Sequence, residues 1–337
     1  MANKNSNLRK AKKTKDDEYY TKYGDISAEI KKDFYGEFFR DKVIYCNCDD
    51  SEKSNFFKFF FNRYEHFGWK RLICTSYNKN GKGTIRIIDG DKNKNGILDT
   101  DEYKDVTLNG NGDFRSEECV EYLKQADVVV TNPPFSLFRE YVKQLMDYGK
   151  KFLIIGPHSA VTYKEIFPYI KNGELWFGRM VTHKEDGKST IKGNSMSFER
   201  YVGGTKDVGA WWFTNIEEVR KNDFFVPKHR KSYKMYSNEY PKYDNYDAIE
   251  VNNWDNIPLD YDGIMGVPYT GLKYFCPKQF EIIGGFNGYK ESDEANGLLC
   301  GTPTEYIDKN GKVKTWTGPT INKKTCYYRL LIRKRTV

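Results

Sequence analysis

The stretch that decides the fold runs from Ala126-Asp-Val-Val-Val-Thr131 through Asn132-Pro-Pro-Phe135 and a helical run at 137–148 to Lys151-Phe-Leu-Ile-Ile155. Short apolar runs on both sides of a helix are typical of parallel strands that are buried on both faces. This stretch therefore predicts a strand–helix–strand unit of a parallel sheet with helices on both sides.

The same alternation extends toward the N-terminus. Ser116 precedes two glutamates, a pattern that predicts a helix N-cap followed by an acidic first turn. Near Trp176 and at 210–213 the runs are less uniformly apolar and suggest antiparallel strands that close the sheet. We therefore predict an α/β fold with strands at 42–47 and 70–75, helices at 54–66 and 116–125, hairpin arms at 84–88 and 103–108, and late strands at 280–283 and 327–332.

Composition excludes several classes of protein. The 337 residues include 16% aromatics, enough for a sizeable core. No apolar run approaches 18 residues and no secretory signal is visible, so we expect no membrane span and no export. The seven cysteines contain no CxxC pair and the four histidines lie far apart, which speaks against a disulfide framework or a zinc site and favours a reducing cytoplasm.

Charge points to a polyanionic partner. The net charge is +8, and the excess is concentrated at the two ends. Residues 1–16 form a basic arm, which we expect to be flexible, and no acidic residue follows Asp308. Basic segments of this kind suit nucleic acid, although a solvated arm and tail is an equal alternative.

The amino-acid composition of the chain changes near residue 220. This change predicts two domains, 17–220 and 221–337.

The sharpest chemical signal is Asn132-Pro133-Pro134-Phe135, directly after a predicted buried strand. Ligands of open parallel sheets bind beyond the carboxyl ends of the strands. The Asn132 side-chain oxygen and the Pro133 carbonyl can accept both hydrogens of a planar amine, while Phe135 offers a face for stacking. Such a site works by orienting an amine nitrogen toward an electrophilic methyl group. The alternative is an ordinary turn that ends a strand.

Several long strings occur in the order found in a known family. The chain resembles the EcoRI-type adenine-specific DNA methyltransferases from about residue 8 to 333, although 77–110 and 180–210 diverge. The strings that carry this resemblance are Asp127–Tyr141, Val43–Asp50, Ser54–Lys58, Gly112–Ser116, Pro241–Ala248 and Pro258–Pro268.

The resemblance implies a Rossmann-like S-adenosylmethionine-dependent methyltransferase domain with a seven-stranded mixed sheet, followed by a smaller target-recognition region. It implies methyl transfer from S-adenosylmethionine to N6 of an adenine that is flipped out of duplex DNA. The catalytic residues would be Asn132, Pro133, Pro134 and Phe135. We expect a monomer, and the resemblance suggests functional pairing with a cognate restriction endonuclease.

The resemblance also implies a set of cofactor-binding residues. Asp113 would accept a hydrogen bond from the cofactor's adenine while Phe114 packs on the ring. The loop after the first strand departs from the usual glycine-rich turn, and the end of the second strand lacks the usual acidic ribose ligand, for which Thr75 or Ser76 would substitute. The further cofactor-binding candidates are Tyr20, Thr21, Asn47, Asp49, Asp50, Asn55, Thr75 and Asn132.

A separate signal lies at 91–102. Oxygen-bearing side chains occupy positions 1, 3, 5, 9 and 12 of a calcium-loop pattern, with Gly96 at position 6. The flanking segments are predicted strands, so the alternative is a loop closed by its own hydrogen bonds. A structural calcium would be held by Asp91, Asn93, Asn95, Asp99 and Glu102.

Two other functions compete with DNA methylation. The Asn-Pro-Pro-Phe chemistry also suits a methyltransferase that acts on an RNA base or a protein glutamine. A DNA-binding module without catalysis is a rival of another class, although the intact Asn132, Pro133 and Phe135 argue against it. Phosphate contacts are expected from basic residues at Lys228, His229, Arg230, Lys231 and Lys234.

Overall fold

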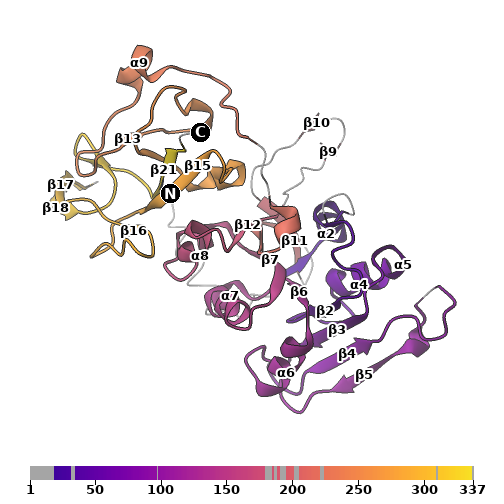
Figure 1. The fold of residues 1–337 in the computed structure, drawn as a ribbon. Helices are drawn as coiled ribbons and strands as arrows, with labels where there is room; N and C mark the ends of the chain where they lie inside the picture. The colour runs from indigo at the N-terminus through magenta and orange to yellow at the C-terminus, as the bar shows by residue number, and fades with distance from the viewer. Residues whose placement is uncertain are drawn as a thin grey trace. The chain divides into compact units, whose positions relative to one another are not determined.

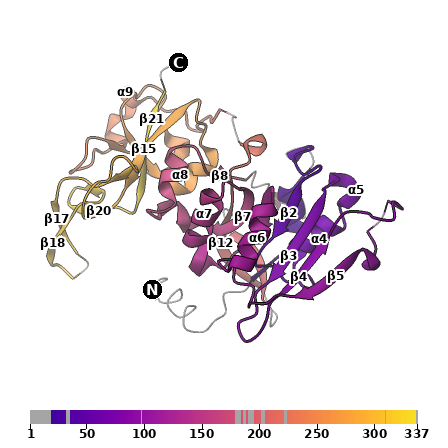
Figure 2. The same ribbon diagram turned by 60° about the horizontal axis from the view of Figure 1, so that its bottom comes forward.

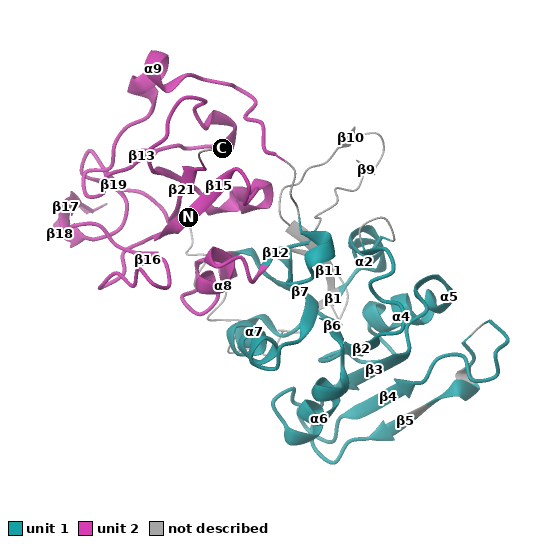
Figure 3. Cartoon of the chain, in the orientation of Figure 1, with its two compact units in different colours: residues 1–158, 176–220 teal, residues 159–175, 221–337 magenta. Residues whose placement is uncertain are grey.

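The computed structural model describes residues 19–31, 35–96, 98–178, 184–185, 188–189, 195–200, 205–220, 224–308 and 310–335. The chain divides into two compact units (Figure 3). Unit 1 comprises residues 1–158 and 176–220, and unit 2 comprises residues 159–175 and 221–337. The basic arm predicted at 1–16 lies outside the described residues.

Unit 1 is built on one mixed sheet, in the order β1-β11-β12-β7-β6-β2-β3-β4-β5, with β8 paired to β12. The predicted number of strands, seven, is too low, because ten strands join this sheet in the described part of the chain. Their bounds are β1 (Tyr19–Thr21), β2 (Val43–Cys46), β3 (Arg71–Ser76), β4 (Thr84–Ile88), β5 (Tyr103–Thr107), β6 (Val128–Thr131), β7 (Lys151–Pro157), β8 (Trp176–Phe177), β11 (Ser195–Arg200) and β12 (Thr205–Thr214).

The centre of this sheet is parallel, as the apolar runs predict. Strands β7, β6, β2 and β3 pair side by side in parallel. The predicted hairpin β4–β5 extends one edge antiparallel to β3, and β12 begins an antiparallel extension of the other edge beside β7. Figure 2 shows β7, β2, β3, β4 and β5 crossing unit 1 as one layer.

Helices cover both faces of the parallel strands (Figure 1). Along β2, Ile44 and Cys46 join an aromatic core with the phenylalanines of α4, while Tyr45 points to the other face, where α6 packs. The helix predicted at 54–66 is two helices, separated at 62–63. The helices of unit 1 are α2 (Tyr23–Glu29), α4 (Asn55–Phe61), α5 (Tyr64–Phe67), α6 (Glu117–Gln125) and α7 (Phe138–Asp147).

The predicted start of α6 is confirmed. Ser116 has extended backbone dihedrals, and its hydroxyl accepts a hydrogen bond from the Cys119 amide. This bond satisfies one of the amides that a helix leaves unpaired in its first turn. Ser54 caps α4 in the same way, accepting from the Phe56 amide at 3.1 Å.

Unit 2 contains a five-stranded sheet in the order β13-β14-β21-β15-β16, on which α8 packs. Two short hairpins, β17–β18 and β19–β20, lie beside one another. The bounds are α8 (Phe167–Lys171), α9 (Tyr233–Tyr236), β13 (Ile249–Glu250), β14 (Met265–Pro268), β15 (Phe280–Phe286), β16 (Leu298–Leu299), β17 (Thr304–Ile307), β18 (Val313–Trp316), β19 (Thr320–Ile321), β20 (Lys324–Thr325) and β21 (Arg329–Lys334).

One further strand pair, β9 (Lys184–Glu185) with β10 (Lys188–Ser189), belongs to neither sheet. Within the described residues no helix is both long and apolar enough to cross a membrane.

Candidate active site

The candidate site lies at the carboxyl ends of the parallel strands in unit 1. From β2 the chain crosses to β3 on one side, whereas β6, on the other side of β2, leads to β7. Crossovers that leave in opposite directions open a crevice beyond the strand ends, where ligands bind in such sheets. A cavity of about 920 Å³ opens here, with Asp50, Ser76, Asp113, Phe114 and Asn132 in its wall. This volume is in the range of small-molecule sites.

A glycine brings the segment before α6 against the end of β3. Gly112 has φ +80°, and a Cβ at this position would lie 2.0 Å from the Ser76 carbonyl oxygen. The Asn78 amide also donates to the Asn111 carbonyl at 2.8 Å. Only glycine tolerates this conformation and this approach, so Gly112 fixes the next two residues, Asp113 and Phe114, in the cavity wall.

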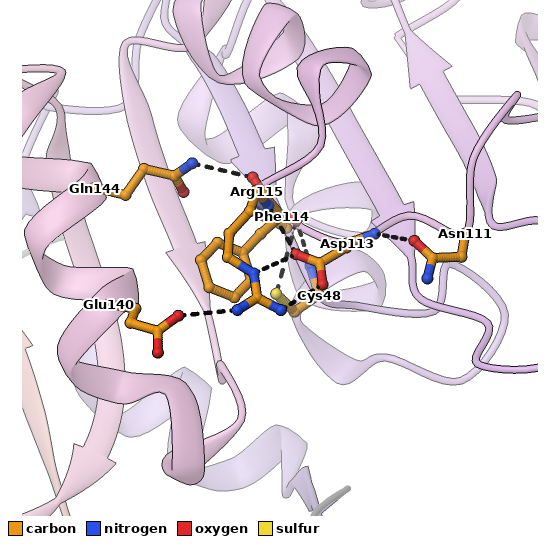
Figure 4. A network of polar contacts seen from close by, with 8 residues as sticks. Cys48, Asn111, Asp113, Phe114, Arg115, Glu140 and Gln144 are labelled. Atoms are coloured by element: carbon orange, nitrogen blue, oxygen red, sulfur yellow. Dashed lines mark hydrogen bonds and ion pairs between the residues drawn. The ribbon is translucent and has the colours of Figure 1, made fainter.

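Arg115 joins Asp113 to α7 (Figure 4). Its Nε and Nη2 donate to the two Asp113 oxygens at 2.9 and 2.7 Å, and its Nη1 donates to Glu140 Oε2 at 2.9 Å. The bidentate bond from Arg115 lowers the pKa of Asp113 below its usual value. The guanidinium also lies 5.3 Å from the centre of the Phe114 ring, whose other neighbour is Tyr141.

Asp49 is buried and ties two strand ends together. Its Oδ1 accepts from Ser54 Oγ at 2.8 Å, and its Oδ2 accepts from Thr131 Oγ1 at 2.7 Å. Burial raises the pKa of Asp49 to about 7, although both hydrogen bonds oppose the shift. Asp49 is also one of the residues that line the cavity, and its carboxylate holds the last residue of β6 in place.

The Asn-Pro-Pro-Phe segment follows that residue directly. Asn132 and Pro134 line the cavity, whereas Pro133 is buried. Phe135 is half-buried against the aromatic core and begins a single 3-10 turn, Phe135–Leu137, that leads into α7. The cavity therefore brings Asn132 together with Asp113 and Phe114, which lie near one another only because the strands end at the same edge.

Several predicted cofactor residues lie beneath or beside the cavity. Asn47 and Thr75 are fully buried, and Thr75 Oγ1 donates to Asn47 Oδ1 at 3.1 Å. Asn55 Nδ2 donates to the Thr21 carbonyl at 2.7 Å, linking α4 to β1. The side chain of Tyr20 lies outside the described residues. Asp50, in the loop after β2, also lies at the cavity, and it accepts from the Glu52 amide at 2.9 Å.

The structure does not support the predicted calcium loop. Asn93 and Asn95 turn their Nδ2 donors toward Asp99 Oδ2, at 3.3 and 2.8 Å, instead of presenting oxygens to a central ion. Glu102 accepts from the backbone amides of Lys92 and Asp99 at 2.6 and 2.9 Å. No group of three or more His, Cys, Asp or Glu residues in the described part of the chain is arranged to hold a metal ion. The loop is closed by its own hydrogen bonds.

Sequence reasoning missed Arg115 and Tyr77. Arg115 stands in the Gly112–Ser116 string, but an arginine next to an aspartate gives no sign that it also reaches Glu140 on α7. Tyr77 follows β3, is 44% exposed and lines the cavity. Its position two residues after the strand predicted at 70–75 was the available signal, since the strand ends at the ligand edge.

An α/β sheet with a cavity at its switch point and Asn-Pro-Pro-Phe at the end of a central strand is the arrangement predicted above for a methyltransferase. The family model described as adenine-specific methyltransferase EcoRI matches residues 7–335. The chain belongs to this family of adenine-specific methyltransferases.

Three relatives agree with this assignment. The chain is 43% identical over 319 residues to the type II methyltransferase M.EcoRI of Escherichia coli. The aligned region covers 88% of this chain and 94% of the relative. Two further type II methyltransferases are similar. M.MgeORF184P of Mycoplasma genitalium is 36% identical, and the alignment covers 97% of this chain and 98% of the relative. M.MpnI of Mycoplasma pneumoniae is 39% identical, and the alignment covers 81% of this chain and 84% of the relative. No solved structure was found to match the chain.

The family decides between the functions that the sequence leaves open. The chain is an adenine-specific DNA methyltransferase, and membership implies S-adenosylmethionine as methyl donor. An enzyme that methylates an RNA base or a protein glutamine, and a DNA-binding module without catalysis, are therefore the less favoured functions.

Proposed function

We propose that the cavity of unit 1 binds S-adenosylmethionine and one adenine flipped out of duplex DNA, and that Asn132 presents N6 of this adenine to the methyl group. The observation that carries this proposal is the position of Asn132 at the carboxyl end of β6, in the wall of the same cavity as Asp113 and Phe114. The residues proposed to bind the methyl donor and the residue proposed to hold the methyl acceptor therefore line the same cavity.

The residues of the cavity fit the methyl donor. Its volume of about 920 Å³ has room for the cofactor and a base together. Asp113 presents a carboxylate that is charged at neutral pH, because its pKa is lowered, and Phe114 lies in the wall of the cavity. Asp50, at the cavity, is placed to accept from ribose hydroxyls or to pair with a cationic amino group. Asn47, Thr75, Thr21 and Asn55 would support this pocket from behind.

The target adenine would be held by the segment after β6. The Asn132 side-chain oxygen and the Pro133 carbonyl accept the two N6 hydrogens, and Phe135 stacks against the ring. Two acceptors held by a proline-stiffened backbone favour a pyramidal nitrogen whose lone pair points at the methyl group. The cofactor supplies an electrophilic methyl on sulfur. As N6 bonds to the methyl carbon the carbon–sulfur bond breaks, and one N6 proton then leaves to water.

Unit 2 is proposed to read the DNA sequence, with phosphate contacts from the segment Lys228–Lys234. Flipping one base costs about a few kcal/mol, and contacts from two units would offset that cost. A monomer is sufficient for this arrangement, and a cognate endonuclease that cuts the unmethylated site is the expected biological partner. A cytoplasmic location stays a prediction.

The test is methyl transfer with a mapped product. Purified chain is incubated with labelled S-adenosylmethionine and unmethylated plasmid DNA, and modified bases are located by single-molecule sequencing. N6-methyladenine at one short motif is the expected result. Label in RNA or protein but not in DNA would contradict the proposal, as would label on cytosine.

A further inference from the structure

The hairpin β19–β20 of unit 2 has an unusual turn. Its two central residues, Asn322 and Lys323, have φ of +49° and +58°. Positive φ at both central positions is the geometry of a two-residue hairpin loop whose second position normally holds glycine. A lysine there is strained, and strain of this kind persists where the surroundings enforce it and where function requires it.

Asp244 enforces the turn. Its carboxylate accepts hydrogen bonds from the Asn322 amide at 3.0 Å and from the Lys323 amide at 2.8 Å. Its own amide donates to the Thr320 carbonyl at 2.8 Å, so the hairpin is clamped at its base as well as at its tip. Thr320 is fully buried. One aspartate therefore holds the strained loop in a single conformation.

A partly buried ion pair supports the segment that follows. Arg329 binds Glu250 through Nη2 at 2.7 Å and Nε at 2.9 Å, and Tyr243, next to Asp244 in the chain, donates its hydroxyl to the same carboxylate. Arg329 Nη1 also lies 3.4 Å from the Tyr327 carbonyl oxygen. Tyr327 is 88% exposed, more than any other large apolar or aromatic side chain of the described residues.

The side chains that the loop presents have no partner in the described part of the chain. Asn322, Lys323 and Lys324 are all exposed, and their side chains make no hydrogen bond or ion pair with described residues. By contrast, two lysines of the segment Lys228–Lys234 are paired, Lys228 with Asp255 at 3.5 Å and Lys231 with Glu239. A rigid loop with unneutralised cations, an amide and an exposed aromatic ring matches the chemistry of duplex DNA.

We propose that the hairpin Thr320–Thr325 together with Tyr327 contacts the DNA substrate. Lys323 and Lys324 bind backbone phosphates, and Asn322 contacts a base edge, where an amide can pair with adenine N6 and N7. The strained turn and its aspartate clamp keep these groups in fixed register. This inference rests on the proposal that unit 2 reads DNA, and names one element that does so.

The experiment measures binding of a duplex oligonucleotide that carries the motif mapped by methyl transfer, by fluorescence anisotropy at several salt concentrations. Lys323→Ala and Lys324→Ala should each raise the Kd roughly fivefold to tenfold near 0.1 M salt and reduce the log–log salt slope by about 0.9. The matched control is Lys278→Ala. This lysine is also exposed, and it lies two residues before β15 begins at Phe280. The other end of β15, at Phe286, is the end that pairs with Arg329. The Kd of Lys278→Ala should stay within about twofold of the parent value.

Asp244→Ala separates geometry from charge. The substitution removes a negative charge, so electrostatics alone would tighten DNA binding. Loss of the clamp should weaken it instead, with little change in thermal stability. Asn322→Ala should relax the mapped motif at one position, because the proposed base contact is lost.

Two failures can be told apart. If the chain methylates its motif and neither lysine variant differs from Lys278→Ala in Kd and salt slope, the hairpin proposal is overturned while the proposed function stands. If the parent chain methylates no DNA, the proposed function itself fails.

Discussion

Thr131 Oγ1 donates a hydrogen bond of 2.7 Å to Asp49 Oδ2. This bond joins the loop after β2 to the last residue of β6, directly before Asn132. The two strands that flank the switch point, β2 and β6, are therefore joined by a side-chain hydrogen bond in addition to their backbone hydrogen bonds. The proposed role of Asn132 works by positioning and would depend on such support.

The buried Asp49 predicts a pH dependence of stability. Its pKa is about 7 in the folded protein against an ordinary value of 3.8, so the folded chain keeps a proton that the unfolded chain has lost. This contribution to the free energy of unfolding is complete below pH 3.8 and is lost as the pH rises to about 7. Asp49→Asn should remove this component, and urea unfolding at pH 4 to 8 measures it.

The neighbouring substitution Asp50→Asn is the matched control and should keep the parent's decline in stability. Stability of Asp49→Asn that falls between pH 4 and 7 as steeply as in the parent would contradict the assignment.

Gly112→Ala should weaken cofactor binding by about tenfold or more. Its Cβ would lie 2.0 Å from the Ser76 carbonyl and would move Asp113 and Phe114 out of the wall. Gly96→Ala is the control, since Gly96 has φ +86° with nothing within 4 Å of an added Cβ. Both variants carry backbone strain, but only the first should change the Kd for S-adenosylmethionine in calorimetry. Equal affinities would refute the role given to this segment.

Asp113→Asn should lower cofactor affinity about tenfold, because a neutral amide replaces a charged acceptor. Glu140→Gln removes the other acid bound to Arg115 but does not touch the cavity wall. Its affinity should stay within about twofold, in line with the small contribution of exposed ion pairs. Equilibrium binding of the cofactor distinguishes the two. A larger loss in Glu140→Gln would instead mean that Arg115, held by both acids, makes the contact.

Calcium should leave the chain unchanged. The oxygens of Glu102 and Asp99 already accept hydrogen bonds from backbone and amide groups of the loop. Thermal unfolding should give the same Tm in millimolar calcium and in chelator, while Glu102→Ala should lose about 1–3 kcal/mol in both. A Tm that rises with calcium in the parent but not in Glu102→Ala would restore the calcium site.

The sequence predicted the central fold well because buried parallel strands and capped helices carry local signals. The apolar run before Asn132 and the Ser116 cap lie where they were expected. The number of strands was not predictable in this way, because β1 and β11 join the sheet through pairing between distant segments.

The site shows the same division. The sequence placed Asn132 directly after a buried strand and proposed Asp113 and Phe114 as cofactor-binding residues, and the cavity brings the three together. It also proposed Asn47 and Thr75 as cofactor ligands, but their burial depends on the packing behind the strands. Nothing local marks Arg115 as the bridge to Glu140, since these residues meet only when α7 packs within unit 1.

The most direct test of the central claim is the rate of methyl transfer by Asn132→Ala. If Asn132 orients N6, single-turnover transfer to the mapped motif should fall by at least about a hundredfold. DNA affinity and the thermal stability of the chain should stay near parent values. A variant that methylates at a rate near the parent's would contradict the account.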